Sequence, residues 1–252
     1  MTTVPRYTQQ SIESEAERLI ETIDPSLIVR PKRIPIGQIV DRLAPQVTVV
    51  HEQPLGALGT KKILGKFEFN PPRIFIDPIL TQESPRYLFT LAHEIGHFVL
   101  HGQYRFSTDL LDQLADNSQI VDSRAHIRTG RTSQRTHRDW LEWHANTFAA
   151  ALLMPRIATN TAVVRFQRDQ LGLRNRVGTV FLDDQPCNKT AYASTISHLR
   201  GVFGSSRQMI HIRLEKLGIL QDFRALNRGS TTLLRTSSEY PHTTRKLFTT
   251  VS

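Results

Sequence analysis

Apolar residues recur at three- and four-residue steps in two stretches near the start of the chain, and three short runs rich in β-branched and aromatic residues follow. The first pattern is typical of amphipathic helices, which are predicted over residues 11–23 and 36–43. The second predicts strands over residues 47–52, 63–69 and 73–77. The chain is therefore expected to form a small sheet with a hairpin, preceded by a helical entrance.

Two longer helices are predicted further along the chain, and both have clear end signals. The first begins at Pro85 after Ser84, a candidate N-cap, and ends before Gly102. The second extends from about residue 138 to residue 154 and is stopped by Pro155.

A helix-turn-helix is predicted over residues 190–220, because two short amphipathic helices flank a glycine-containing turn. Ser205 and Gln208 have the capping-box spacing for the second of these helices, and Gly218 is expected to end it. Residues 103–137, between the two longer helices, are polar and are expected to form a long surface connection.

Composition places the chain among ordinary globular proteins. Of its 252 residues, 39% are hydrophobic and 22% are charged. No apolar run approaches the roughly 18 residues of a membrane span, and the polar start lacks a secretory signal, so a cytoplasmic protein without membrane contact is expected. Cys187 is the only cysteine, so any metal ligands must be His, Asp or Glu.

The stretch LFTLAHEIGHFVLHG contains a His-Glu-x-x-His motif. His93 and His97 are four residues apart on a predicted helix, so both imidazoles can reach one metal ion, with Glu94 beside them. A catalytic zinc ion takes three protein ligands and keeps a fourth position for water, whose proton such a glutamate accepts. The motif arises by chance in about two chains per hundred of this composition, so a third ligand is needed to support it.

Three candidates exist for the third ligand. His101 follows His97 by one helical turn, but ligands on three successive turns of a straight helix diverge from one ion, so His101 is expected to support the site or line its cleft. The metzincin arrangement needs a histidine where this chain has Gln103. Glu142, on the second longer helix, remains, and Asn146 one turn later is placed to hold a ligating histidine.

The two longer helices together resemble the ImmA/IrrE family of metallopeptidases, whose core is of the gluzincin type. The similarity rests on LFTLAHEIGHFVLHG and on the pattern ExxANxFAAxLLMP at residues 142–155. The resemblance implies that His93, His97 and Glu142 bind one Zn²⁺ per chain. It also implies that Glu94 is the catalytic base.

The fold class that follows is α+β. A zincin-like peptidase core, in which a small mixed sheet supports packed active-site helices, is expected before a small all-α helix-turn-helix-like domain. The expected parts are an N-terminal helical extension, the core, the second domain and a flexible tail, at residues 1–34, 35–158, 159–226 and 227–252.

The function implied by the resemblance is that of a zinc-dependent endopeptidase that cleaves a helix-turn-helix transcriptional repressor, which releases stress-response or mobile-element genes. The substrate is expected to add a strand to the sheet near residues 63–69. His101, Tyr104 and His137 are candidates for positions in the cleft. Most other histidines, including His144, are expected to be exposed or to be ordinary hydrogen-bonding partners.

The net charge of +9 is concentrated in the last part of the chain. Residues 1–155 contain 17 basic and 17 acidic side chains, whereas residues 156–252 contain 15 and 6. A basic unit can bind nucleic acid or an acidic partner. The alternative function is therefore that of a regulator that binds DNA, or that captures a repressor without cutting it. Its zinc site would be structural or catalytically inactive (idle). Its candidate DNA contacts, on the second helix of the predicted motif, are Arg207, His211, Arg213 and Lys216.

Overall fold

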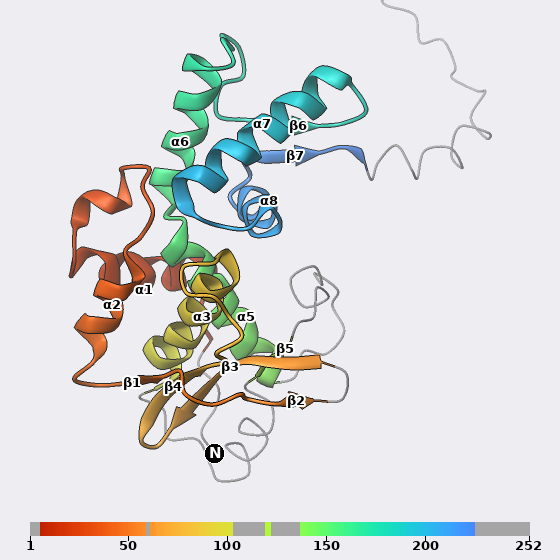
Figure 1. The fold of residues 1–252 in the computed structure, drawn as a ribbon. Helices are drawn as coiled ribbons and strands as arrows, with labels where there is room; N and C mark the ends of the chain where they lie inside the picture. The colour runs from red at the N-terminus through yellow and green to blue at the C-terminus, as the bar shows by residue number, and fades with distance from the viewer. Residues whose placement is uncertain (1–5, 59–60, 103–118, 122–136, 225–252) are drawn as a thin grey trace, which may run out of the picture.

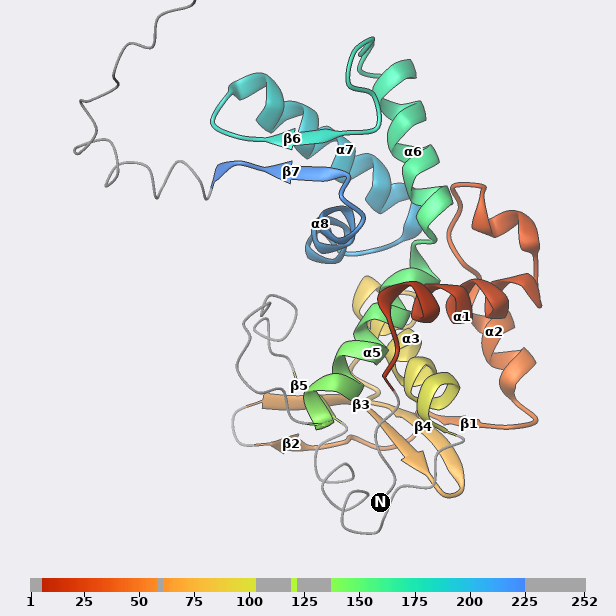
Figure 2. The ribbon, with the colours of Figure 1, turned by 180° about the vertical axis from the view of Figure 1, so that it is seen from behind.

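The computed structural model describes residues 6–58, 61–102, 119–121 and 137–224. Over these residues the protein has the predicted α+β class. Figures 1 and 2 show a small sheet at one end, two long helices against it, and a group of helices at the other end. Two predictions, a cleft position for Tyr104 and a flexible tail over residues 227–252, lie outside the described residues. So does most of the surface connection predicted over residues 103–137, of which only 119–121 and 137 are described.

Two helices and a short 3-10 turn precede the sheet. Helix α1, Gln9–Glu21, begins with a capping box in which Thr8 and Ser11 each accept a hydrogen bond from the other's backbone N–H. The turn η1, Pro25–Ile28, and helix α2, Ile36–Leu43, follow. Both predicted helices are therefore confirmed. The fully buried face of α1 consists of Ile12, Ala16 and Ile20.

The sheet has five strands and mixed direction. Strand β1 is parallel to β4, while β3 is antiparallel to β4, β2 and β5. The order is β1-β4-β3-β2, with β5 also paired to β3. This confirms the small mixed sheet. The strands are β1 Thr48–Val50, β2 Ala57–Leu58, β3 Lys61–Phe69, β4 Pro72–Ile76 and β5 Gln119–Val121.

Strand β3 is an inner strand, which corrects one prediction about the substrate. Its residues from Gly65 to Phe69 pair with β4, and Ile63 and Lys66 pair with β5 on the other side. The prediction of substrate addition near residues 63–69 is wrong at residues 63–66, because another strand of the same chain already occupies that edge.

Two long helices, α3 and α5, pack together beside the sheet (Figure 1). Helix α3, Pro85–His101, begins where Ser84 accepts a hydrogen bond from the Tyr87 N–H, and it ends before Gly102, as predicted. Helix α5, His137–Leu153, begins one residue earlier than predicted. Helix α3 also contacts β3 and β4, so it lies between the sheet and α5.

Gly96 allows α3 and α5 to approach closely. A Cβ atom at this position would lie 3.1 Å from Cδ1 of Phe148 and 3.2 Å from Cα of Ala145. Because the second neighbour is backbone, a larger side chain at Gly96 would push the helices apart. This contact therefore sets the spacing between the two helices that bear the predicted metal ligands.

The part of the chain after α5 is not purely helical. Its two short strands pair in parallel, so the prediction of an all-α domain is wrong. Three-residue strands are too short to show a periodic pattern in the sequence. The elements are α6 Arg156–Asp169, β6 Val180–Leu182, α7 Pro186–Phe203, α8 Arg207–Lys216 and β7 Leu220–Asp222.

Helices α7 and α8 are joined by a short turn. Gly204, at φ 66°, ends α7 in the left-handed conformation that favours glycine. Ser206 caps α8 by accepting a hydrogen bond from the Met209 N–H. The predicted cap, Ser205, is wrong by one residue, since that side chain is buried without a hydrogen-bond partner among the described residues.

Most of the buried apolar residues form one continuous cluster from Ile12 in α1 to Leu220 in β7. Helix α1, predicted to be an extension, packs against α5 (Figure 2). The predicted domain boundaries stay predictions.

In the described part of the chain, no single helix is long and apolar enough to span a membrane. Helices α5 and α6 reach the required length and hydropathy only when they are taken together, and they are bent by 50° relative to each other.

Candidate metal centre

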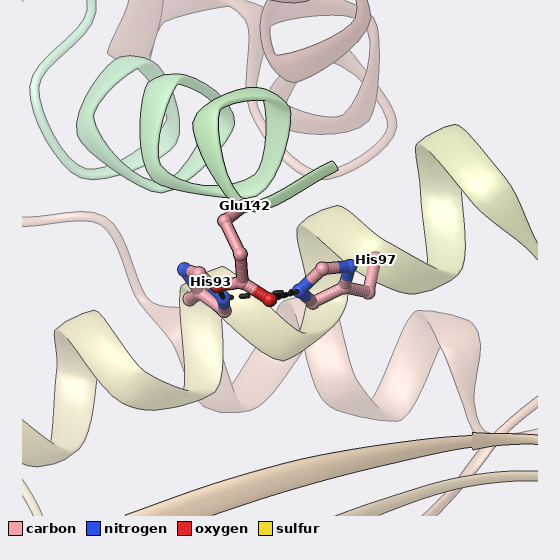
Figure 3. Close-up of side chains that lie close together, drawn as sticks. All are labelled: His93, His97 and Glu142. Carbon is pink, nitrogen blue, oxygen red and sulfur yellow. Dashed lines mark hydrogen bonds and ion pairs between the residues drawn. The ribbon is translucent and has the colours of Figure 1, made fainter. Parts of the chain in front are cut away.

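The two histidines of the His-Glu-x-x-His motif lie on one face of α3 and point toward α5. Their Nε2 atoms are 3.0 Å apart. Glu142 extends from α5 between them, with one carboxylate oxygen 3.3 Å from Nε2 of His93 and the other 3.6 Å from Nε2 of His97 (Figure 3). The structure therefore brings together the three predicted ligands, and their donor atoms all lie within 4.8 Å of one another.

This donor set fits a zinc ion. Two ligand atoms about 2.0–2.1 Å from a tetrahedral ion stand about 3.3 Å apart. The two Nε2 atoms here are 3.0 Å apart, and Glu142 places one carboxylate oxygen 3.3 Å from Nε2 of His93 and its other oxygen 3.6 Å from Nε2 of His97. Two imidazole nitrogens and one carboxylate oxygen are also donors that zinc prefers, and three such ligands leave one position open.

The second imidazole nitrogen of His93 has a defined partner. Its Nδ1 atom lies 3.1 Å from Oδ1 of Asn146, one turn after Glu142 on α5. Because an amide oxygen only accepts, Nδ1 of His93 carries the proton and donates it. The lone pair of the ring is then on Nε2, which faces the three-donor group. Asn146 thus lies where the sequence predicts.

His97 is followed by two more histidines in the protein interior. Nδ1 of His97 lies 3.2 Å from Nδ1 of His101, and Nε2 of His101 lies 3.2 Å from Nδ1 of His144 on α5. Burial lowers the pKa of His101 well below its usual value and lowers that of His144 to about 4. Both imidazoles are therefore neutral at pH 7.

One of the two roles predicted for each of these histidines is wrong. His101 does not line a cleft, because its side chain is 0% exposed, but its contact with His97 agrees with the predicted support of the site. His144 is equally buried and therefore not exposed, but it is a hydrogen-bonding partner of His101, which is the other predicted role. A signal for it was present: position 144 lies on the same buried stripe of α5 as Leu141, Ala145 and Phe148, at helical spacing.

Glu94 is a fully buried carboxyl group without a hydrogen-bond partner among the described residues. Its side chain lies against β3, where a Cβ atom added at Gly65 would be 2.6 Å from Oε1. Burial raises the pKa of Glu94 well above its usual value, and the negative charge of Glu142 raises it further. An orphaned carboxyl group in a dry site is unusual unless the site serves a ligand or a reaction.

The carboxylate of Glu142 differs from that of Glu94. Burial raises its pKa, but the close contacts of the carboxylate with the rings of His93 and His97 favour its charged form and outweigh burial, so the net pKa is lowered. Its side chain is 21% exposed, whereas both histidines are almost fully buried. Glu142 therefore favours its ionised form, whereas the neighbouring Glu94 favours its protonated form.

The remaining cleft candidate, His137, is the first residue of α5 and has an exposed side chain. It is not a member of the three-donor group formed by His93, His97 and Glu142.

The predicted DNA contacts on α8 have different environments. Arg207 and Lys216 are exposed, and His211 is partly buried, with Nδ1 2.9 Å from the hydroxyl of Tyr192. Arg213 is the exception, since it is only 2% exposed.

Arg213 is committed to the protein interior. Its Nη1 atom lies 2.8 Å from the Glu13 carboxylate in α1, and Nε donates to the Met154 carbonyl at 3.0 Å. Its prediction as a DNA contact is therefore wrong.

A second group of metal-type ligands, His211, Glu215 and Asp222, was not anticipated from the sequence. Asp222 is already engaged, since Arg224 donates to it from both its backbone and its guanidinium group. A cation thus already neutralises Asp222, and Glu215 lies 3.5 Å from Nε2 of His211. We interpret the group as an ion-pair cluster.

A comparison with known protein families places most of the chain in one family. Residues 47–215 match the model of a peptidase family described as the IrrE N-terminal-like domain. The matched residues include the sheet, α3 and α5, and they continue into α8. No curated protein matches the chain at a significant level.

Proposed function

The chain belongs to the IrrE N-terminal-like family of peptidases, and from this premise we propose that it is a zinc-dependent endopeptidase of the cytoplasm. The observation that supports the proposal most strongly is the three-donor group on α3 and α5 with a buried carboxyl group beside it. His93, His97 and Glu142 would hold the ion. Bound zinc polarises a carbonyl group and lowers the pKa of water to about 7.

Glu94 is the proposed general base. Its carboxylate is removed from water and receives no hydrogen bond from the described residues, so it binds a proton more strongly than an exposed glutamate. A cation held by His93, His97 and Glu142 would favour the ionised form of Glu94. The ionised carboxylate could then take the proton of the attacking water and pass it to the leaving amine. Asn146 keeps the His93 ring in the tautomer that presents Nε2 to the site.

The proposed substrate is a helix-turn-helix transcriptional repressor, whose cleavage would release stress-response or mobile-element genes. The support is the resemblance to ImmA/IrrE metallopeptidases. DNA contact by α8 has less support, because Arg213 is paired with Glu13 in the interior.

The test uses three variants of the full chain, each co-expressed with a candidate helix-turn-helix repressor from the same organism. We expect Glu94→Gln to bind about one equivalent of zinc but to leave the repressor intact. His93→Ala should lose both zinc and cleavage. Glu21→Gln, which makes the same substitution at an exposed position of α1, should match the wild type.

Two results would refute the proposal. The first is less than about half an equivalent of metal in wild-type protein prepared in zinc-containing buffer. The second is relief of repression by Glu94→Gln, which would indicate that the protein captures the repressor without cutting it. Strongly salt-dependent operator binding by the full chain would instead favour the DNA-binding alternative.

A further inference from the structure

Three histidines form a continuous line that leads away from the proposed zinc site. His97 contacts His101, and His101 contacts His144, each through ring nitrogens 3.2 Å apart. The line starts on α3 and ends on α5, so it joins the same two helices as the proposed ligands. Because His101 and His144 are 0% exposed, bulk water does not compete for these contacts.

Each contact between two neutral imidazoles needs one donor and one acceptor. If Nε2 of His97 offers its lone pair to a metal ion, then Nδ1 of His97 carries the proton and donates to Nδ1 of His101. His101 must then carry its own proton on Nε2 and donate it to Nδ1 of His144. Only one arrangement of protons satisfies both contacts once His97 binds metal.

We infer that His101 and His144 are positioning residues for the ligand His97, acting as a relay of two neutral imidazoles that fixes its tautomer and its ring orientation. The inference rests on the proposed zinc site. His93 has its own partner in Asn146, so the two ligating histidines are held by different means. A ligating histidine whose other nitrogen loses its partner binds metal about 10–100-fold more weakly.

The surroundings of His144 favour an imidazole over a carboxylate at the end of the line. Tyr7 meets its ring edge-on at 5.3 Å, and Trp143 lies 5.4 Å away. Its Nε2 atom has no hydrogen-bond partner among the described residues. A carboxylate here would be a buried charge without a counterion, whereas a neutral imidazole accepts the hydrogen bond of His101 at a smaller desolvation cost.

The first test measures the zinc dissociation constant by competition with a chromophoric chelator. We expect His101→Phe to weaken zinc binding about 10–100-fold, because Nδ1 of His97 loses its acceptor. His101→Gln, whose amide oxygen can accept and whose amide nitrogen can donate, should recover most of this loss. Equal affinities for wild type and His101→Phe would overturn the inference.

The matched pair at position 144 separates hydrogen bonding from packing. Phenylalanine keeps the aromatic volume but accepts no hydrogen bond, whereas glutamine accepts one and packs less well. The relay predicts that His144→Phe weakens zinc binding more than His144→Gln does. The opposite order would show that His144 only fills space. His198→Gln, on α7 where the ring stacks on Phe166, serves as the control and should leave the affinity unchanged.

The proton arrangement can also be observed directly by ¹⁵N NMR of the zinc-loaded wild type. We expect the proton on Nδ1 of His97 and on Nε2 of both His101 and His144. A proton on Nδ1 of His101 would refute the relay while leaving the zinc site intact. Failure of the wild type to bind zinc would instead refute the proposed function, so the two failures are distinguishable.

Discussion

Gly65 and Glu94 show how one missing side chain makes room for a proposed catalytic group. Any Cβ atom at Gly65 would lie 2.6 Å from Oε1 of Glu94 and 2.6 Å from the Thr90 methyl group. Both distances are shorter than van der Waals contact. Position 65 must therefore be a glycine for the Glu94 carboxyl group to lie where it does.

The variant Gly65→Ala should lower peptidase activity without loss of zinc. The new methyl group must displace the Glu94 carboxyl group, and a shift of about 1 Å in a catalytic group can cost about 100-fold in rate. We expect a decrease of at least about tenfold in kcat, with zinc content unchanged by elemental analysis. Gly37→Ala, where a Cβ atom would meet nothing within 4 Å, is the control. Full activity of Gly65→Ala would contradict the role given to Glu94.

The residues of the site differed in how far the sequence alone could predict them. His93, Glu94 and His97 lie in one short motif whose helical spacing needs no tertiary information. Glu142 could be reached because it lies on a second strongly marked helix. The proposed positioning role of His144 depends on its contact with His101, 43 residues away in sequence. No local sequence pattern predicts a contact over that separation.

At the scale of secondary structure, the site is a consequence of how α3 and α5 pack. The proposed ligands come from both helices, so their separation depends on the distance between the helix axes. Gly96 determines that distance because it has no side chain where α3 contacts Ala145 and Phe148 of α5. Helices with strong caps and a proline stop were predictable, whereas three-residue strands such as β6 were not.

The variant Gly96→Val should destabilise the protein and weaken zinc binding together. Its branched side chain overfills the contact with Phe148, which costs about 1–3 kcal/mol, and it moves Glu142 away from the histidines. Urea unfolding and zinc competition measure the two effects. Gly201→Val, in α7 where a Cβ atom would meet nothing within 4 Å, should change neither by much. Wild-type zinc affinity in Gly96→Val would show that helix spacing does not control the site.

At the scale of the whole molecule, a buried ion pair joins α1 to α8, which are the first and last helices of the described residues. Glu13 in α1 accepts hydrogen bonds from Arg213 in α8 and from Arg156 in α6, at 2.8 and 2.9 Å. The sequence analysis predicted that Arg213 contacts DNA. This prediction failed because a residue's position on a helix does not reveal a partner 200 residues away in sequence. Charge on a helix is therefore a poor guide to function until its partners are known.

This ion pair predicts a specific dependence of stability on pH. Burial raises the pKa of Glu13, but the charge of Arg213 and hydrogen bonds from neighbouring groups outweigh burial, and the net pKa is lowered from 4.5. A group with a lowered pKa in the folded state stabilises the protein above its unfolded pKa, and this contribution is lost as pH falls below about 4.5. The wild type should therefore lose stability in this range faster than a variant without the Glu13 carboxylate.

Glu13→Gln tests this directly, with Glu21→Gln as the control at an exposed position of the same helix. At pH 7 the Glu13 variant leaves the Arg213 guanidinium buried without its counterion, and we expect it to lose about 3 kcal/mol of unfolding free energy in urea. The difference from wild type should shrink as pH falls below about 4.5, because the wild type then loses the same interaction. Adding Arg213→Met should restore part of the stability by removing the unpaired charge. A difference that stays constant with pH would show that Glu13 stabilises the fold by packing and not by charge.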